Sequence, residues 1–394
     1  MISAVTIDDP VVVLGAVRTP IGRFGGAFKD VDAHELGAAC IRAAVDRAGV
    51  PPDEVDEVVM GQVGQVGPDA YNARRCALVA GLPPQTTALN VNRLCASGLQ
   101  AIVQGAQGLL LGDATVVVAG GNESMSRQPF LDFSARAGWR LGPRRLVDGT
   151  LSLVTDPFGA YPMGVTAERV AERWSVTREE QDAFALRSQQ RASAALERGD
   201  FDAEIVVVTG TGAPVLHDEH LRPETTLESL ASLKPVFEDG GSVTAGNSSG
   251  INDGAAAVVL TRASEAERRG LRPRLLLRAW AVTGIEPAFM GFAPAQAIPK
   301  ALARAGLGLD EIDFVELNEA FAAQAVAVIR ETGLDPDRVN PSGGAIALGH
   351  PVGATGAILT VKLLHGLERT GGRFGMVAMC IGGGQGMAAV FERP

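Results

Sequence analysis

The chain contains the stretch Arg47-Ala48-Gly49-Val50-Pro51-Pro52-Asp53-Glu54-Val55-Asp56. A close copy, Arg304-Ala305-Gly306-Leu307-Gly308-Leu309-Asp310-Glu311-Ile312-Asp313, follows at an offset of 310 − 53 = 257 residues. Near the same offset, Cys95-Ala96-Ser97-Gly98 opens one apolar helical segment and Gly353-Ala354-Thr355-Gly356 opens another. A common alternation of strands and helices can imitate a repeat by chance, but the shared residue identities favour an internal duplication.

The segments around these repeats alternate between strand-like and helix-like patterns. In the first copy we expect strands at residues 11–15, 55–60 and 115–119, and helices at 33–48 and 96–111. Alternation of this kind is typical of α/β proteins in which helices cover a mainly parallel sheet. Because 394 residues exceed one usual domain, we expect two or three packed units.

A segment of different composition separates the two copies. Residues 122–250 are rich in Arg and Glu, and one long helix is expected at 178–199. We therefore expect an N-terminal half (1–121 and 251–272), a loop domain (122–250) that covers the face of the sheet and binds substrate, and a C-terminal half (273–394).

Composition restricts the class of function. Hydrophobic residues make up 46% of the chain and charged residues 20%, which is typical of a compact enzyme. The formal net charge of -10 argues against nucleic-acid binding. The beginning of the sequence lacks a basic signal-peptide region, and no run of about 18 uninterrupted apolar residues follows, so we expect a cytoplasmic protein that does not cross a membrane. The cysteines form no Cys-x-x-Cys pair, which indicates reduced thiols and no metal site.

Cys95 lies where a short extended segment meets the N-terminus of a helix that we expect to start at Ala96. The unpaired amides and the dipole of such a helix end stabilise a thiolate, which would make the sulfur a competent nucleophile. The small residues at positions 96–98 let a substrate carbonyl approach the sulfur. Taken alone, Cys95 fits a buried structural cysteine at a tight helix entry better than a nucleophile, and the other motifs reverse that preference.

His350 is flanked by glycines in the stretch Asn340-Pro341-Ser342-Gly343-Gly344-Ala345-Ile346-Ala347-Leu348-Gly349-His350-Pro351. Near neutral pH, a histidine here can accept a proton from a thiol or donate a hydrogen bond to a carbonyl oxygen. The alternative is a histidine that only caps a turn. Two further histidines, His34 and His365, lie on expected helices, and we expect their rings to be solvated.

Cys380 ends an expected strand in Met379-Cys380-Ile381-Gly382-Gly383-Gly384-Gln385-Gly386. The glycine amides that follow can form an oxyanion hole, and the Cys380 thiol can act as a second acid or base. A phosphate cradle is the alternative, although no Lys, Ser or Thr follows at the spacing of a P-loop.

Asn318 lies in Glu316-Leu317-Asn318-Glu319-Ala320-Phe321, at the end of an expected strand. Polar side chains at this place in α/β enzymes often point into the site, and an asparagine amide can orient a water molecule. Asparagine is also an ordinary N-cap residue, so this motif alone is a weak indication.

Together, these four stretches resemble the thiolase family, and the resemblance covers nearly the whole chain. It implies that Cys95 is acylated, that His350 activates Cys95 and that Cys380 moves protons. It also implies two oxyanion holes. One is formed by His350 and a water held by Asn318, and the other by the backbone amides of Cys95 and Gly382.

The implied reaction is the reversible thiolytic cleavage of 3-ketoacyl-CoA to acetyl-CoA and acyl-CoA, or the Claisen condensation of two acetyl-CoA molecules in reverse. In the ping-pong scheme, His350 takes the proton of Cys95 and the thiolate attacks the 3-keto carbon. Acetyl-CoA then leaves as an enolate that Cys380 protonates, and coenzyme A removes the acyl group. Coenzyme A is a substrate, and no metal or cofactor is needed because the thioester stabilises the carbanion.

The resemblance further implies two halves of like topology, layered α-β-α-β-α with an inserted loop domain, and assembly as a homodimer or homotetramer. The residues that match coenzyme A contacts in the family are Arg222, Thr225 and Ser229 near the nucleotide end, Ser249 and Phe321 along the pantetheine tunnel, and Met163 in the loop domain. Without the family, Arg222 fits a solvated surface charge and Ser249 a turn residue.

Two positions depart from the family pattern. Pro162 precedes Met163 where many short-chain biosynthetic members carry histidine, which favours the degradative 3-ketoacyl-CoA branch and leaves chain length open. Ser342 replaces a common asparagine without affecting the proposed proton transfer. A related condensing enzyme, a catalytically silent acyl-CoA or lipid carrier, and an unrelated cysteine hydrolase are rival interpretations. The combination of motifs and the duplication disfavour all three.

Overall fold

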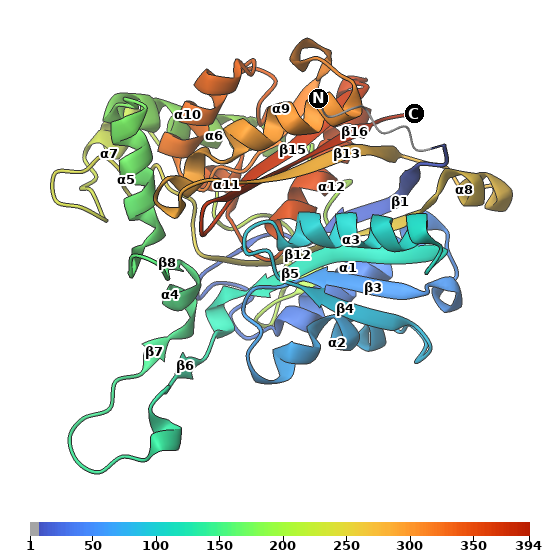
Figure 1. Cartoon of the computed structure of the whole chain (residues 1–394), viewed down its shortest axis with the longest axis horizontal. Coiled ribbons are helices and arrows are strands. Elements are labelled where there is room, and N and C mark those ends of the chain that lie inside the picture. The colour runs from blue at the N-terminus through green and yellow to red at the C-terminus, as the bar shows by residue number, and fades with distance from the viewer. Residues whose placement is uncertain (1–7) are drawn as a thin grey trace.

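The protein is built on a ten-stranded mixed sheet, seen in a computed structural model that describes residues 8–394 (Figure 1). The strand order is β14-β15-β16-β13-β1-β12-β5-β3-β4, and β2 pairs with β12. These strands are β1 (Val11–Arg18), β2 (Gly22–Arg23), β3 (Glu57–Gly61), β4 (Thr87–Val91), β5 (Val116–Ser124), β12 (Asn252–Arg262), β13 (Leu275–Gly284), β14 (Phe314–Leu317), β15 (Phe374–Ile381) and β16 (Gln385–Glu392).

The strand pairing repeats between the two halves of the chain. Most pairs in the sheet are antiparallel, so the expectation of a mainly parallel sheet is wrong. In the first half, β1–β12 and β12–β5 are antiparallel, whereas β5–β3 and β3–β4 are parallel. In the second half, β13–β16 and β16–β15 are antiparallel and β15–β14 is parallel, and a parallel bridge from Val315 to Val339 takes the place of the fifth strand. The halves join through β1 and β13, which pair only at Val12–Leu276 and Val13–Leu275.

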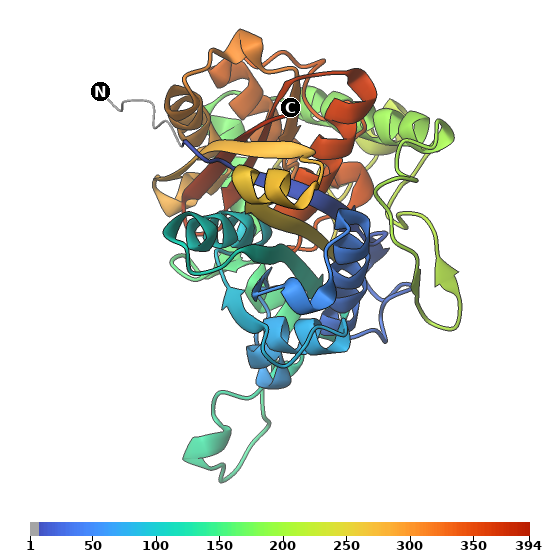
Figure 2. The same ribbon diagram turned by 90° about the vertical axis from the view of Figure 1, so that its right-hand side faces the viewer.

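Helices form layers between and outside these two halves of the sheet (Figures 1 and 2). The middle layer is α3 (Ser97–Leu111) and α12 (Thr355–Thr370), which pack against each other. A Cβ on Gly98 would lie 2.7 Å from the Ala357 nitrogen, so the two backbones touch at this crossing. The outer helices are α1 (Ala33–Ala48) and α2 (Asn72–Val79) on the first half, and α9 (Pro294–Ala305) and α10 (Ala322–Thr332) on the second.

Within the described residues, the segment Leu94–Leu111 is long and apolar enough to cross a membrane by length and composition alone. Most of it is α3, whose buried face packs in the middle layer against α12, β3 and β5. A core helix of this kind passes the same hydropathy test as a membrane span, so the segment is no evidence for one.

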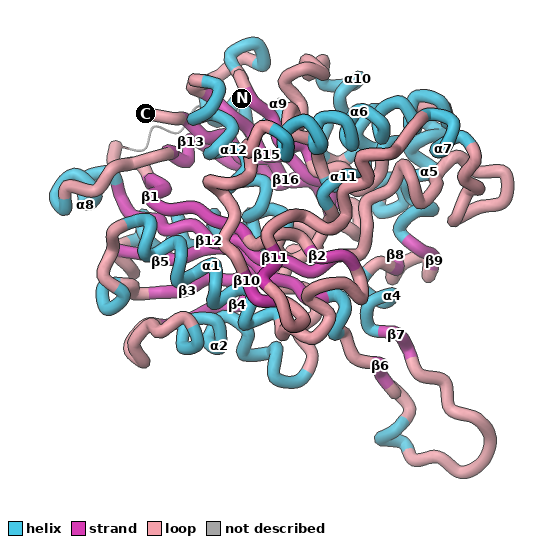
Figure 3. The backbone as a smooth tube through the Cα atoms, turned by 180° about the vertical axis from the view of Figure 1, so that it is seen from behind, coloured by secondary structure: helices cyan, strands magenta, loops and turns pink. Residues whose placement is uncertain are grey.

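The segment between the halves folds into short hairpins and helices. Its helices are α4 (Gly149–Leu153), α5 (Met163–Arg173), α6 (Arg178–Glu197) and α7 (Leu227–Ala231), and its hairpins are β6–β7 (Phe130–Leu131, Val147–Asp148), β8–β9 (Thr155–Asp156, Tyr161–Pro162) and β10–β11 (Val208–Thr209, Pro214–Val215). The β6–β7 hairpin projects from the body, and β10–β11 lies near β2 (Figures 1 and 3). Two short helices complete the fold, α8 (Ala263–Arg269) and α11 (Ala345–Leu348). The domain bounds that we expected remain a prediction.

The expectation that His34 and His365 are solvated is wrong, because both rings are buried. His365 lies on α12 in the middle layer, where its Nε2 is 3.4 Å from the Ala16 carbonyl oxygen. Burial lowers the pKa of His365 to about 4 and also lowers that of His34. The position of a residue on an expected helix does not reveal which face of that helix other elements cover. Helix α12 is covered on nearly all sides.

Candidate active site

Cys95 lies at a sharp turn between β4 and α3. Leu94 has a φ of 48°, in the left-handed region that residues with a Cβ rarely adopt. The Ser97 hydroxyl fixes this turn, because it accepts from the Arg93 N–H at 2.9 Å and donates to the Leu94 carbonyl at 2.7 Å. The helix begins at Ser97 with Ala96 as its N-cap, so Cys95 directly precedes the helix entry.

Two backbone amides lie beside the Cys95 sulfur. The N–H groups of Gly382 and of Cys95 itself are close enough to lower its pKa. Burial has the larger effect, and together with the nearby Glu123 carboxylate it raises the pKa of Cys95 above its usual value. The expectation of a thiolate stabilised at rest is therefore wrong, because desolvation outweighs the helix end. The resting group is a thiol with two amides positioned to receive negative charge.

Cys380 lies next to Cys95 at the end of β15. Burial raises the pKa of the Cys380 thiol well above its usual range, and the neighbouring Cys95 raises it further. Cys380 packs in a small apolar cluster with Met290 and Ala320, against which Met163 and Phe321 also pack. The structure therefore brings the second cysteine together with two of the predicted coenzyme A contacts.

A side chain on Gly382 would crowd its neighbours. A Cβ there would lie 3.0 Å from the Met163 Cε and 3.4 Å from the Leu94 Cδ1. Met163, Leu94 and Gly382 thus surround the sulfur that the Gly382 amide contacts. A glycine at this position keeps the amide accessible to an oxygen developing on the Cys95 adduct.

His350 is buried and held by two hydrogen bonds, and the one made by its ring assigns its tautomer. Its backbone N–H donates to the Asn252 Oδ1 at 2.9 Å, and its Nδ1 lies 2.6 Å from the Thr355 Oγ1. The Thr355 hydroxyl donates its only hydrogen to the Pro351 carbonyl at 2.9 Å, so it accepts from Nδ1–H. Nε2 is therefore the unprotonated ring nitrogen. Because burial lowers the pKa of His350 to about 4, the ring is neutral near pH 7 and able to accept a proton.

Asn318 follows β14 and its amide has no hydrogen-bond partner within residues 8–394, although the side chain is fully buried. Its backbone N–H donates to the Ala378 carbonyl at 2.9 Å, which places it beside β15, the strand that carries Cys380. A buried amide without a partner is costly unless a water or ligand satisfies it. Asn318 is therefore free to hold such a group.

Packing between the loops brings the four stretches to one place. Val352, two residues after His350, packs in the same apolar cluster as Leu94, the residue before Cys95. On the other side, Ala320 follows Asn318 by two residues and packs against Cys380. The four stretches therefore meet where α3 and α12 begin, between the two halves of the duplication.

The predicted coenzyme A contacts form two groups. Ser249 belongs to the first, with Phe321, because its N–H donates to the Ala320 carbonyl at 3.0 Å. Arg222, Thr225 and Ser229 form the second, on the turn that leads into α7, where the Thr225 hydroxyl donates to the Arg222 carbonyl at 2.8 Å. Within residues 8–394 the Arg222 side chain has no ion-pair partner within 4.0 Å, and it is exposed.

Sequence reasoning missed the residues that support the site, which are Glu123, Asn252, Glu319 and Thr355. Thr355 had a signal, because it matches Ser97 in the repeated segment, and both hydroxyls brace a turn before a helix. Glu123 accepts from the N–H groups of Val63, Gly64 and Gly353 at 2.9 to 3.1 Å, and burial raises its pKa to about 7. Its contacts come from two distant segments, so no local pattern could reveal them.

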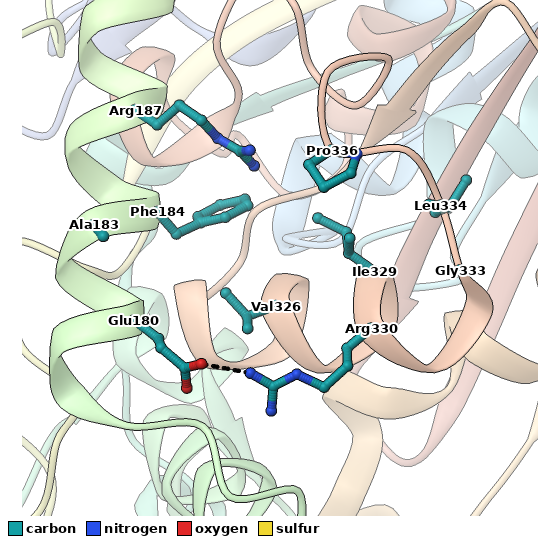
Figure 4. Close-up of a pocket in the computed structure, with 10 residues that line it drawn as sticks. All are labelled: Glu180, Ala183, Phe184, Arg187, Val326, Ile329, Arg330, Gly333, Leu334 and Pro336. Carbon is teal, nitrogen blue, oxygen red and sulfur yellow. Dashed lines mark hydrogen bonds and ion pairs between the residues drawn. The ribbon is translucent and has the colours of Figure 1, made fainter.

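A groove of about 580 Å³ lies elsewhere, between α6 and α10 (Figure 4). Arg330 and Glu180 form an ion pair of 2.6 Å beside it. The lining residues include none of the predicted site residues, so the groove is separate from Cys95. Among residues 8–394, no group of three or more His, Cys, Asp or Glu side chains is arranged to hold a metal ion.

Comparison with known proteins identifies the family. The family models for the thiolase N-terminal domain and the thiolase C-terminal domain match residues 11–264 and 271–393. The chain belongs to the thiolase family. This thiolase is 52% identical over 389 residues to beta-ketothiolase BktB of Cupriavidus necator, with 97% of this chain and 99% of that protein covered. It is 47% identical to an acetyl-CoA acetyltransferase of Chromobacterium violaceum, with 98% and 100% covered.

Solved thiolase structures have the same fold. Acetyl-CoA acetyltransferase of Bacillus anthracis superimposes with a TM-score of 0.96 at 44% identity, covering 98% of this chain and 99% of that one. Human mitochondrial 3-ketoacyl-CoA thiolase in complex with CoA gives 0.96 at 42% identity and covers 100% of both chains. The expected fold class is confirmed, and so is the expectation of an acyltransferase with thiolase activity.

Proposed function

We propose that this thiolase carries its acyl intermediate on Cys95. The observation that carries the proposal is the convergence of the Cys95 and Gly382 amides on the Cys95 sulfur, at a position where Gly382 leaves room for substrate. Two N–H donors aimed at the reacting atom stabilise an oxyanion that forms beside it. The resting thiol gains charge only as the reaction begins, when these donors are most effective.

The proton of Cys95 passes to His350 in this scheme. The Thr355 hydroxyl holds the proton of the ring on Nδ1, which leaves Nε2 as the base. Burial lowers the pKa of His350 to about 4 and raises the pKa of Cys95, so an ion pair between them is disfavoured in the resting site. Proton transfer is therefore coupled to attack on the 3-keto carbon, when the amides take up the negative charge.

Cys380 supplies the proton that the departing acetyl-CoA enolate requires. Its raised pKa keeps it protonated near pH 7, and its position beside Cys95 brings the thiol to the reacting carbon. The bond between the 2- and 3-carbons breaks, the electron pair stays on the acetyl-CoA fragment, and the Cys380 proton completes acetyl-CoA. Asn318 holds a water that, with His350, stabilises the enolate oxygen.

Coenzyme A enters as a substrate along the loop domain. We assign its nucleotide end to Arg222, Thr225 and Ser229, because Arg222 is an exposed cation in a chain of net charge -10. Its pantetheine arm then passes Ser249, Phe321 and Met163, which lead to Cys380. In this scheme no metal or redox cofactor is needed, since the thioester stabilises the carbanion.

The remaining expectations belong to the same proposal. The protein acts in the cytoplasm as a homodimer or homotetramer, and residues 122–250 form the loop domain that binds coenzyme A. Thiolysis rates across 3-ketoacyl-CoA substrates of increasing length would identify the acyl chain that it prefers.

Mass spectrometry after incubation with acetyl-CoA tests the central assignment. We expect an acetyl group on the peptide that contains Cys95, and free coenzyme A should remove it. Cys40 and Cys76 are internal controls, since burial raises the pKa of Cys40 to about 12 and that of Cys76 further. An adduct on another cysteine, or none, would refute the role of Cys95.

A further inference from the structure

Asn318 lies between two buried carboxylates, Glu316 and Glu319. Its own amide has no partner within residues 8–394, so its position depends on what holds its neighbours. Glu319 contacts the loop 340–349 that leads to His350 directly, and Glu316 is linked to the same loop through Lys362. The loop that carries Asn318 is therefore connected to the loop that leads to His350, and these two residues form the proposed oxyanion hole.

Glu319 accepts three hydrogen bonds from two separate segments. Its Oε2 accepts from the Ser188 hydroxyl on α6 at 2.6 Å and from the Ile346 N–H on α11 at 3.2 Å. Its Oε1 accepts from the Asn340 Nδ2 at 2.8 Å. Gly344 packs directly on this carboxylate, and a Cβ there would collide with it. One carboxylate thus joins the loop domain, the loop before His350 and the loop of Asn318.

Asn340 completes the connection to β14. It has a φ of 47°, in the left-handed region. Its side chain forms hydrogen bonds with the β14 backbone as a neighbouring strand would. Its Oδ1 accepts from the Leu317 N–H and its Nδ2 donates to the Leu317 carbonyl, both at 2.8 Å. Leu317 directly precedes Asn318. A shift of Asn340 would therefore move the backbone that carries the Asn318 amide.

Glu316 makes a second, independent connection. Lys362 on α12 donates to both Glu316 oxygens at 2.9 and 3.0 Å, and it also donates to the Gly343 carbonyl at 2.8 Å. His350 has separate anchors in Asn252 and Thr355. Loss of the Glu319 contacts would then displace Asn318 relative to His350, while His350 keeps its place.

We propose that Glu319 is a positioning residue. It fixes where the Asn318 amide lies relative to the His350 ring, and so determines the geometry of the enolate-binding oxyanion hole. This inference rests on the proposed function, in which that hole serves carbon–carbon bond cleavage and formation. Acetyl transfer to Cys95 uses the other hole, formed by the Cys95 and Gly382 amides. Glu319 should therefore matter for one half-reaction and not for the other.

Glu319→Gln tests this division. The glutamine amide places an NH₂ group against donors in either orientation, because both carboxylate oxygens of Glu319 are acceptors here. We expect the variant to lose roughly 100-fold in thiolysis and in condensation, as for a misplacement near 1 Å. The rate at which acetyl-CoA acetylates Cys95 should stay nearly unchanged.

Glu168→Gln is the matched control. Glu168 is also buried and accepts from the N–H groups of Ser242 and Val243 and from the Ser242 hydroxyl, at 2.8 to 3.0 Å. It lies on α5, and its hydrogen-bond partners are Ser242 and Val243 rather than residues of the loop 340–349. We expect this variant to show a similar loss of thermal stability without selective loss of one half-reaction.

A double-mutant cycle separates positioning from general damage. If Glu319 acts through Asn318, Glu319→Gln should cost little more in a protein that already carries Asn318→Ala. Additive losses, or equal losses in both half-reactions, would overturn the proposal. If Glu319→Gln does not fold, Ser188→Ala should show the same selectivity at smaller amplitude. Absence of acetyl-Cys95 in the unmodified protein would instead refute the proposed function.

Discussion

Replacement of Thr355 by valine tests how His350 is prepared as a base. Valine keeps the branched shape but removes the hydroxyl that accepts from the His350 Nδ1–H at 2.6 Å. A buried N–H without an acceptor costs about 1–3 kcal/mol. The imidazole avoids this cost by moving its proton to Nε2, so the form with a basic Nε2 becomes the minor tautomer.

This penalty can be converted into a rate. Since 1.36 kcal/mol is a factor of ten, a cost of about 1–3 kcal/mol on the active tautomer lowers kcat/KM by about 5-fold to about 160-fold. The pKa of His350 is about 4, so the ring is neutral in both proteins from pH 6 to pH 8. Steady-state thiolysis of acetoacetyl-CoA should therefore show a loss that does not vary across this pH range.

Thr360→Val is the matched control, because it removes a buried hydroxyl from the same helix. The Thr360 hydroxyl donates to the Gly356 carbonyl at 2.9 Å, just as that of Thr355 donates to the Pro351 carbonyl, but it does not contact His350. We expect near-normal kcat/KM for Thr360→Val and recovery of activity in Thr355→Ser. Equal losses in the two valine variants, or full activity in Thr355→Val, would refute the tautomer argument.

Two further predictions concern other buried groups. Cys380→Ser should still acquire an acetyl group on Cys95 but should lose thiolysis and condensation, because a hydroxyl is a far weaker acid than a thiol; full turnover would contradict the assignment. His365→Gln should weaken the dependence of stability on pH, because burial lowers the pKa of His365 from 6.5 to about 4. Between these values the unfolded chain binds a proton that the folded chain does not, so stability is lost as pH falls, by up to about 3 kcal/mol. Denaturant unfolding at pH 7 and pH 4.5 measures this loss, and an equal loss in the variant would exclude His365 as its source.

The fold was predictable because its defining features repeat in the sequence. The copies that begin at Arg47 and Arg304 mark equivalent turns before β3 and β14, and the repeated helix openings mark α3 and α12. Repetition constrains topology more strongly than local propensity does, since each copy must pack the same faces. The pairing of β1 with β13 was not predictable, because only two residue pairs form it.

The candidate site was predictable only in part. Glycines and a helix entry indicated Cys95, His350 and Gly382, because close approach to a ligand leaves a trace in the local sequence. The state of Cys95 was not predictable, since its pKa depends on burial by segments far away in the chain. The same holds for Glu319, whose partners come from positions 188, 340 and 346.

The crossing of α3 and α12 at Gly98 has a consequence for substrate entry. Opening the two halves like a hinge would pull this contact apart and break the close packing of the middle layer. We therefore expect the motions that admit substrate to Cys95 to come from small surface segments such as the β8–β9 hairpin and the turn before α7. If product release limits turnover, its rate will be set by these small segments, and substitutions there will change kcat without touching a reacting group.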